Sequence, residues 1–172
     1  SRFVNQQNPR AQKIRTVDPI AIPTGVYIDQ MEFADSYNLN VGGTLWQKYP
    51  LAIADQVKIG FRLPQLSPFA EASYIEEAYR KVVEKEDQEG HVLVGWDFRV
   101  TLRLNLNYAD YPFDKRHLNI EMVPLDNQDH LLFTPDLSSY AFTNPTQKSS
   151  LNHHIDISGS EVLESYFNYS NE

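Results

Sequence analysis

Side chains able to carry acid–base, nucleophilic or metal chemistry are few and scattered in this chain of 172 residues. It contains no cysteine, which excludes disulfides, thiolate metal sites and cysteine nucleophiles. It also lacks the GxSxG elbow, the phosphate-binding P-loop, the GxGxxG loop and the HExxH motif. The motifs typical of serine hydrolases, nucleotide-binding enzymes and zinc proteases are therefore missing from the sequence. We therefore expect that the protein is not an enzyme.

The histidines do not form a metal-binding pattern. His153 and His154 are adjacent, so on a strand their imidazoles would point to opposite faces and would not converge with Asp156. The other three histidines are isolated in sequence, as is usual for surface or hydrogen-bonded structural groups. We expect neither a metal nor a cofactor.

Aromatic rings are the most plentiful groups able to contact a ligand, because the chain has ten Tyr, nine Phe and two Trp. Their default role is core packing, since rings bury the largest apolar area. In a protein of net charge −8, an aromatic face can also hold a cation or an amine. Trp96 and Phe98 lie on the apolar side of an alternating run, whereas Trp46 and Tyr140 lie nearer to turns. These four residues are the candidate ligand-binding residues.

The stretch "YPFDKRH", which begins at Tyr111, combines two aromatic rings with a proline, an acid and basic groups. Pro112 fixes its own φ angle and favours an extended conformation at Tyr111, so the loop is stiff and holds its rings in defined directions. Asp114 can accept hydrogen bonds from local backbone N–H groups or pair with a neighbouring cation. A contact surface formed by this stiff loop and an ordinary turn between strands both fit this pattern.

Composition sets the limits on class and partners. The length suits one domain, and 41% apolar residues suffice for a core. Fifteen basic against 23 acidic residues argue against nucleic acid as a partner, because phosphate binding needs a basic surface. No run approaches the roughly 18–20 apolar residues that cross a bilayer, and the start lacks a signal-peptide pattern. We expect a soluble piece, such as a mature chain or a fragment of a larger protein.

The strongest structural signal is a long alternating run, "HVLVGWDFRVTLRLNLNY". Its large apolar residues share one parity, and polar residues occupy the other. Only a long strand with one face on a core explains this pattern, because a helix would scatter the same residues around its circumference. The residues on the apolar parity are Val92, Val94, Trp96, Phe98, Val100, Leu102, Leu104, Leu106 and Tyr108.

Weaker alternation and turn residues predict further strands on both sides of this run. Residues 1–21 are polar and lack periodicity, which predicts a flexible N-terminal arm before a β-sandwich domain over residues 22–172. In the first strand the apolar parity switches near Asp29, which indicates a β-bulge. The expected strands cover residues 22–33, 39–49, 56–63, 118–122, 130–134, 153–158 and 162–169.

One segment supports two interpretations. "SYIEEAYRKVVEKE" places apolar residues at helical spacing, and Ser73 with Glu76 forms a capping-box pattern. The turn-like "KEDQEG" that follows instead suits a hairpin returning from an extended segment. The sequence as a whole predicts an all-β, immunoglobulin-like antiparallel β-sandwich, with a short helix at this segment as an alternative.

A long strand, then aromatic-Pro-Phe-Asp, then an alternating strand resembles the extracellular ligand-binding domain of pentameric ligand-gated ion channels. The matching residues are Tyr111, Pro112, Phe113 and Asp114, and the flanking cysteines are missing, as in prokaryotic members. The specific match covers Trp96–Met122. Further stretches that resemble such bacterial extracytoplasmic sensor domains are "GVYIDQMEF", "TLWQKYP", "EAYRKV", "GWDF" and "TPDLSSY".

The resemblance implies an extracytoplasmic domain that senses a small molecule at the periplasmic or extracellular face of the cytoplasmic membrane. It implies a coupling role for Tyr111–Asp114 towards a transmembrane region of the same protein, a homo-oligomer such as a pentamer, and a strand at residues 75–83. Trp46, Trp96 and Phe98 match the side of the ligand site that the neighbouring subunit supplies. No tryptophan follows Met122, so the principal-side tryptophan has no counterpart. The alternative is a β-sandwich module that contacts a protein or a glycan without a small-molecule pocket.

Overall fold

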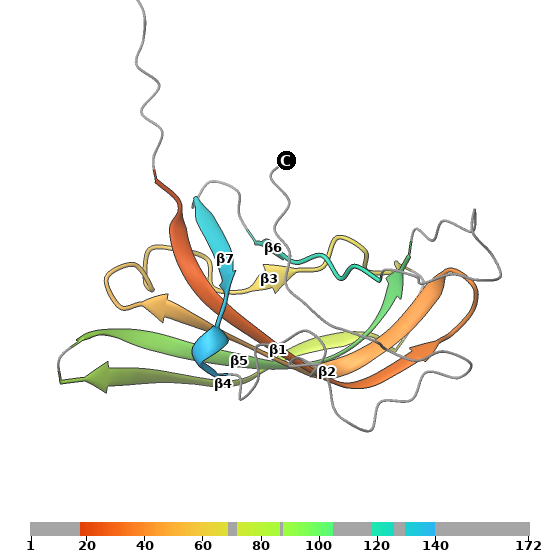
Figure 1. Ribbon diagram of the computed structural model, residues 1–172, viewed down its shortest axis with the longest axis horizontal. Helices are drawn as coiled ribbons and strands as arrows, with labels where there is room; N and C mark the ends of the chain where they lie inside the picture. Colours follow the sequence, from red (N-terminus) through yellow and green to blue (C-terminus); the bar gives the residue numbers. More distant parts are fainter. Residues whose placement is uncertain (1–17, 69–71, 87, 105–117, 126–129, 140–172) are drawn as a thin grey trace, which may run out of the picture.

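Alternating sequence patterns fold into a β-sandwich in the computed structural model, which describes residues 18–68, 72–86, 88–104, 118–125 and 130–139. A five-stranded sheet of order β4-β5-β2-β1-β7 faces a two-stranded sheet of β3 and β6 (Figure 1). The all-β fold is as expected. The strands are β1 (Ile20–Phe33), β2 (Asn38–Pro50), β3 (Phe61–Arg62), β4 (Tyr74–Lys85), β5 (Gln88–Arg103), β6 (Val123–Pro124) and β7 (Leu131–Pro135), and a 3-10 helix, η2, spans Leu137–Ser139.

The core lies on one face of the large sheet, which we call the inner face. β5 lies beside β2 over thirteen residue pairs and contributes every second residue to the core, as its alternation predicts. The segments around β3 and β6 cover this face (Figure 1). The buried core cluster consists of Ile28, Met31, Leu39, Val41, Leu45, Phe61, Leu63, Val94, Trp96, Phe98, Val100, Leu102 and Leu104.

The β-bulge expected near Asp29 is present. The pairing of β1 with β2 shifts between Ile28 and Gln30, so Asp29 is the extra residue. The shift brings Ile28 and Met31 to the same inner face although their sequence parities differ. β1 begins at Ile20, two residues before the expected start.

Gly43 of β2 lies opposite Ile28, beside the bulge in β1, where the two backbones leave no room for a side chain. A Cβ atom at this position would overlap the carbonyl oxygen of Tyr27, which belongs to the backbone and cannot rotate away. We expect Gly43→Ala to lower the free energy of unfolding by about 1–3 kcal/mol, as overpacking does. Chemical denaturation measures this loss. Gly42→Ala is the matched control, because a Cβ there meets only side chains at ordinary contact distance, and equal losses at both positions would contradict the prediction.

The segment "SYIEEAYRKVVEKE", whose apolar residues have helical spacing, forms a strand. The resemblance implied this strand, whereas the local capping-box pattern favoured a helix. β4 lies antiparallel to β5 from Tyr74 to Lys85, and Lys85 pairs with Gln88 at the hairpin end of the two strands. Ser73 does not cap a helix; its hydroxyl accepts a hydrogen bond from the Thr101 N–H at 3.1 Å. Backbone pairing with β5 therefore outweighs local helix propensity.

Three expectations about strands need correction. The sheet is not purely antiparallel, because β7 runs parallel to the start of β1. Residues 56–63 and 118–122 alternate in burial as expected, but in the first segment only β3 is a strand, and its partner β6 begins after the second segment, which itself contains no strand. The physical reason is that these segments pack apolar side chains on the core while their backbones mostly lack a neighbouring strand. Residues 106, 108 and 153–169 lie outside the described part of the chain.

Candidate ligand-binding face

The two tryptophans lie on opposite faces of the large sheet. Trp46 pairs with Gly95, whereas its neighbour Leu45 pairs with Trp96, so the two indoles point in opposite directions. Trp96 is 7% exposed and packs edge-to-face on the Phe61 ring, with centroids 5.4 Å apart. Phe98 is 6% exposed on the same inner face. One pocket cannot hold both tryptophans, and the inner pair belongs to the core.

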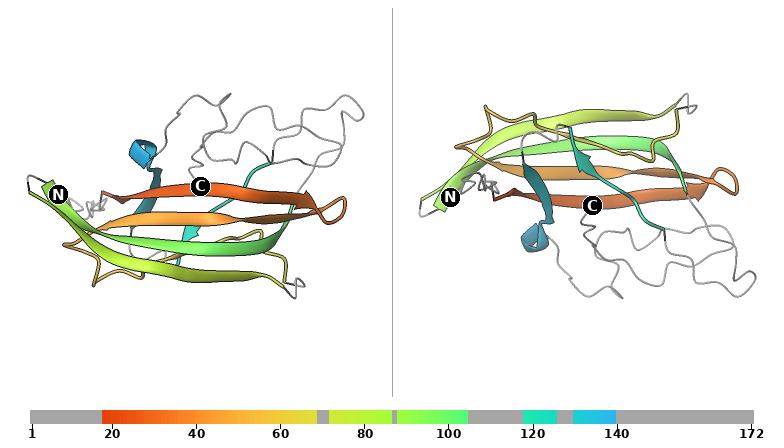
Figure 2. Two further views of the ribbon diagram at one scale, coloured as in Figure 1. Left: turned by 90° about the horizontal axis from the view of Figure 1, so that it is seen from below. Right: turned by 90° about the horizontal axis from the view of Figure 1, so that it is seen from above.

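Trp46 instead belongs to a row of residues across the outer face, the face of the large sheet away from the core. Figure 2 (left) looks onto this face. The row runs from Gly25 through Trp46 and Gly95 to Tyr79 on four neighbouring strands. A Cβ atom at Gly25 would overlap the Trp46 ring, and one at Gly95 would overlap the Tyr79 ring. Each ring therefore occupies the space above a glycine, which a larger residue would fill.

Asp136, at the end of β7, is the polar centre of this face. Its carboxylate is 4% exposed. Oδ2 accepts a hydrogen bond from the Trp46 indole N–H at 2.9 Å and one from Ser139, and it pairs with the Lys48 ammonium at 2.9 Å. Oδ1 accepts from the Ser138 hydroxyl at 2.9 Å. The acid thus joins η2 to β2 and fixes the indole in its plane.

Hydrogen bonding controls the charge of this acid. Burial acts to raise the pKa of Asp136, but hydrogen bonds from Lys48, Ser139, Trp46 and Ser138 outweigh it and lower the pKa from 3.8 to about 2. The carboxylate is therefore ionised at neutral pH, and its charge is balanced by Lys48. It does not offer a spare anion to an amine ligand beside Trp46.

A further cation lies against the Tyr79 ring. The Lys81 ammonium lies 5.9 Å from the centroid of the Tyr79 ring, a cation–π contact. The pKa of His91 is lowered by burial and by the nearby charges of Lys48 and Lys85, so its neutral form is favoured. This face thus combines two aromatic rings with cationic and neutral polar side chains.

Sequence reasoning found Trp46 but missed Asp136, Lys48 and Tyr79. Lys48 shares the strand parity of Trp46, and that period of two was the signal available for it. Asp136 begins the short turn "DLSS", whose composition indicates a capped turn but not its neighbours. Tyr140, the coupling residues Tyr111–Asp114 and the pair His153–His154 lie outside the described residues, so their expected roles stay predictions.

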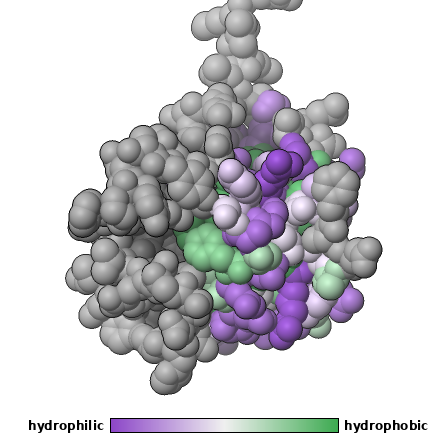
Figure 3. Space-filling view, turned by 90° about the vertical axis from the view of Figure 1, so that its right-hand side faces the viewer, coloured by the Kyte–Doolittle hydropathy of each residue, from purple (hydrophilic) through white to green (hydrophobic). Residues whose placement is uncertain are grey.

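A hollow lies at the end of the molecule that contains the turn between β1 and β2. It has a volume of about 600 Å³. Figure 3 looks onto this end, where a small hydrophobic area lies among hydrophilic residues. Its lining residues are Tyr37, Pro64, Gln65, Leu66, Pro68, Arg103 and Leu104.

Comparison with models of known protein families and with curated proteins found no match for this chain. Within the described residues, no helix has the length and apolarity needed to cross a membrane. In the same part of the chain, no three side chains of His, Cys, Asp or Glu gather as metal ligands.

Proposed function

We propose that this chain is the small-molecule-sensing domain of a membrane receptor or ligand-gated ion channel, placed outside the cytoplasmic membrane. Its ligand contacts the outer face around Trp46, and residues Tyr111–Asp114 pass the response to a membrane region. The observation that carries the proposal is the arrangement at the end of β5, the strand that leads towards these residues. Three separate segments are tied together there.

Hydrogen bonds define this end of the sandwich. The Leu104 N–H donates to the Tyr37 carbonyl at 2.7 Å, and the Arg103 N–H donates to the Gln65 carbonyl at 2.7 Å. The end of β5 is thus fixed to the β1–β2 turn on one side and to the 64–68 segment on the other. Residues 105–117 follow this fixed end in the sequence. A change in the packing of the large sheet would therefore be passed to them through β5.

The β1–β2 turn is itself held by an acid. The Asp35 carboxylate accepts the Tyr37 N–H at 2.8 Å, the Asn38 N–H at 2.9 Å and the Asn38 side-chain amide at 2.7 Å. The Asn38 side-chain bond and then the Tyr37 backbone bond lower the pKa of Asp35. Such a pinned turn supports a contact surface, since its backbone is ordered before any partner arrives.

A second function is favoured by the flat rings of Trp46 and Tyr79. Aromatic rings on one sheet face suit stacking against sugar rings, and Tyr79 is 46% exposed, so a glycan-binding module is the alternative. Ligand screening separates the two. Thermal-shift assays with organic acids, amino acids, amines and oligosaccharides detect any ligand that prefers the folded chain, because such binding raises the melting temperature. Responses only to oligosaccharides would favour the module.

Tryptophan fluorescence of the chain then locates a ligand that raises the melting temperature. A Trp96→Phe variant retains Trp46 as its single indole, and its emission should shift when the ligand binds the outer face. A Trp46→Phe variant retains only the buried Trp96, and its emission should not change. A response confined to Trp96 would contradict a binding site at the outer face.

Phe113→Ala tests the coupling role. We expect the variant chain to keep its unfolding midpoint and its ligand affinity, because the coupling role requires a ring that contacts the membrane region and not the core. The receptor that carries this domain should lose its response to the ligand. Phe61→Ala is the matched control, since Phe61 is 6% exposed and its loss should lower stability by about 3–5 kcal/mol. A Phe113→Ala chain destabilised to the same degree would identify Phe113 as a core residue and overturn the coupling role.

A further inference from the structure

Four charged side chains on the outer face of β4 and β5 form no ion pair with any described residue. They are Glu76, Lys81, Asp97 and Arg99, and all four are exposed. Glu76 and Asp97 lie directly opposite each other across the two strands, and like charges in such positions destabilise a sheet. The two carboxylates therefore favour a cation that a binding partner brings.

A β-bulge in β4 places an acid and a cation symmetrically about the Tyr79 ring. The register of β4 against β5 skips Ala78, so Glu76 shares the outer face with Tyr79 and Lys81 although its sequence parity differs. Along β5, Lys81 lies two positions from Tyr79 in one direction, and Glu76 lies two positions away in the other. Two positions along a strand span about 7 Å. A cation and an acid thus flank the ring at matching distances.

The same symmetry continues at the next outer positions of β4. Val83 lies beyond Lys81 and Tyr74 lies beyond Glu76, each four β5 positions from Tyr79. Tyr74 is 39% exposed and Tyr79 is 46% exposed, so part of each ring is open to water. From either end, the outer side of β4 presents an apolar or aromatic residue, a charge, the Tyr79 ring, the opposite charge and another apolar or aromatic residue.

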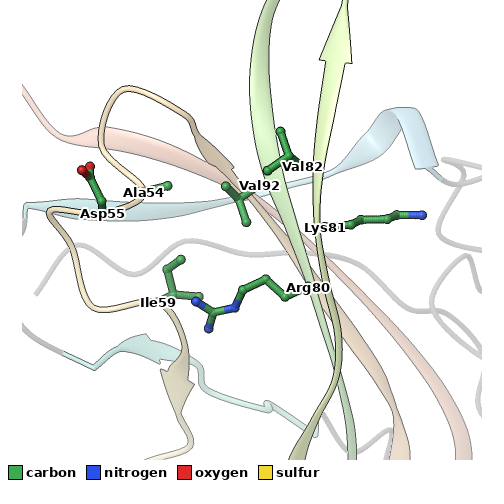
Figure 4. A pocket seen from close by; sticks show the side chains of 7 residues that line it. All are labelled: Ala54, Asp55, Ile59, Arg80, Lys81, Val82 and Val92. Atoms are coloured by element: carbon green, nitrogen blue, oxygen red, sulfur yellow. The ribbon is translucent and has the colours of Figure 1, made fainter.

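Lys81 is held on this surface by its neighbour. Its ammonium lies 5.9 Å from the centroid of the Tyr79 ring, and this exposed cation–π contact leaves the positive charge without a carboxylate. Arg80 leaves β4 on the other side, as Figure 4 shows, and there it forms a balanced pair with Glu77. Arg80 therefore does not compete with Lys81 for a partner on the outer face.

We propose that the outer face of β4 and β5 binds the same face of a second copy of this chain. The twofold axis lies between the two facing sheets and runs parallel to the row from Tyr79 to Gly95, at right angles to the strands. Rotation by 180° about this axis exchanges the two sides of the row. Lys81 of each copy then faces Glu76 of the other copy, with Asp97 beside it, and the two Tyr79 rings meet at the axis.

A second copy fits this surface because the surface complements itself. Across the axis, Tyr74 of each copy faces Val83 of the other. Arg99 faces His91 of the other copy, and the pKa of His91 is lowered by burial and by nearby lysines, so its neutral form is favoured. The two acids and two cations of each copy leave the contact without an excess of either sign.

The contact area sets the strength of the dimer. Residues 74–83 of β4 pair with residues 91–99 of β5, and the rise and spacing of strands make this a strip of roughly 30 Å by 10 Å. A standard interface buries about 800 Å² on each partner, so the dimer is a weak one. It needs no ligand at Trp46 and does not depend on the proposed sensing role.

Sedimentation equilibrium of the chain, at protein concentrations up to about 1 mM, tests the association. We expect a reversible monomer–dimer equilibrium that weakens as the salt concentration rises, because salt screens the contact between Lys81 and Glu76. A chain that stays monomeric at every concentration would overturn the proposal, and so would a ring of five copies that forms without a dimer.

Exchanging the two charges tests the position of the axis. Glu76→Lys and Lys81→Glu each place like charges against each other twice in the dimer, so each should weaken dimerisation by about tenfold or more. The double variant restores opposite charges at both contacts and should regain most of the lost affinity. A double variant as weak as the single variants would contradict the twofold arrangement.

Glu77→Lys is the matched control, because it makes the same charge change on the other side of β4, where Glu77 pairs with Arg80. It should leave dimerisation unchanged, and thermal melting of each variant reports whether the fold is intact. Equal weakening by Glu77→Lys and Glu76→Lys would show that association responds only to net charge, which would refute the proposed contact.

Discussion

Replacing Trp96 with alanine is expected to lower the free energy of unfolding by about 3–5 kcal/mol, the range for removing a large buried aromatic side chain. Trp96 is 7% exposed in the centre of the core and packs on the Phe61 ring, so its removal leaves a cavity that the sheet cannot close. Urea denaturation measures the loss.

Trp46→Ala is the matched control for this prediction, because it removes the same side chain from the outer face. Trp46 lies over Gly25 and donates one hydrogen bond to Asp136, so its loss should cost less than that of Trp96. If Trp96→Ala lost less stability than Trp46→Ala, the assignment of Trp96 to the core would be wrong.

Asp136→Ala should cost about 1.5–3 kcal/mol, the range for hydrogen bonds to a charged group, since the carboxylate is 4% exposed while Lys48 stays 24% exposed to water. The substitution removes the acceptor for Lys48, Trp46, Ser138 and Ser139 at once. Asp55→Ala is the control at an exposed acid and should change stability by no more than about 0.5 kcal/mol. Similar losses for both variants would contradict the role of the Asp136 cluster.

The same acid predicts a dependence on pH. Its pKa is about 2 in the folded chain and 3.8 without folded-state partners. A lowered pKa stabilises the fold above pH 3.8, and this contribution of about 2 kcal/mol is lost as the pH falls towards 2. Denaturation curves between pH 5 and pH 2 should therefore show a smaller pH dependence for Asp136→Asn than for the wild type. An unchanged dependence would refute the lowered pKa.

The sequence predicted the fold where local alternation and tertiary burial agree. The apolar parity of β5 and the bulge at Asp29 were both readable, because side-chain direction along a strand follows directly from parity. β4 was ambiguous, since its helical spacing is local and its pairing with β5 is not. Parity also identified the buried residues around β3 and β6, but parity carries no information about backbone partners.

The candidate site was only partly predictable for a related reason. In the sequence, Trp46 lies near a turn and Trp96 lies in an alternating run. Only the pairing register shows that their side chains lie on opposite faces of the sheet. Asp136 is 90 positions from Trp46, and no periodic pattern links them. The row of two rings on two glycines likewise needs the register of four strands.

The strand β4 has consequences for how copies of this domain meet. Its pairing with β5 is interrupted between Glu77 and Tyr79 and again near the hairpin, and charged residues recur along it. Irregular, charged outer strands disfavour joining of sheets into fibrils. Contacts between copies of this domain are thus directed to side-chain surfaces rather than to shared backbone ladders.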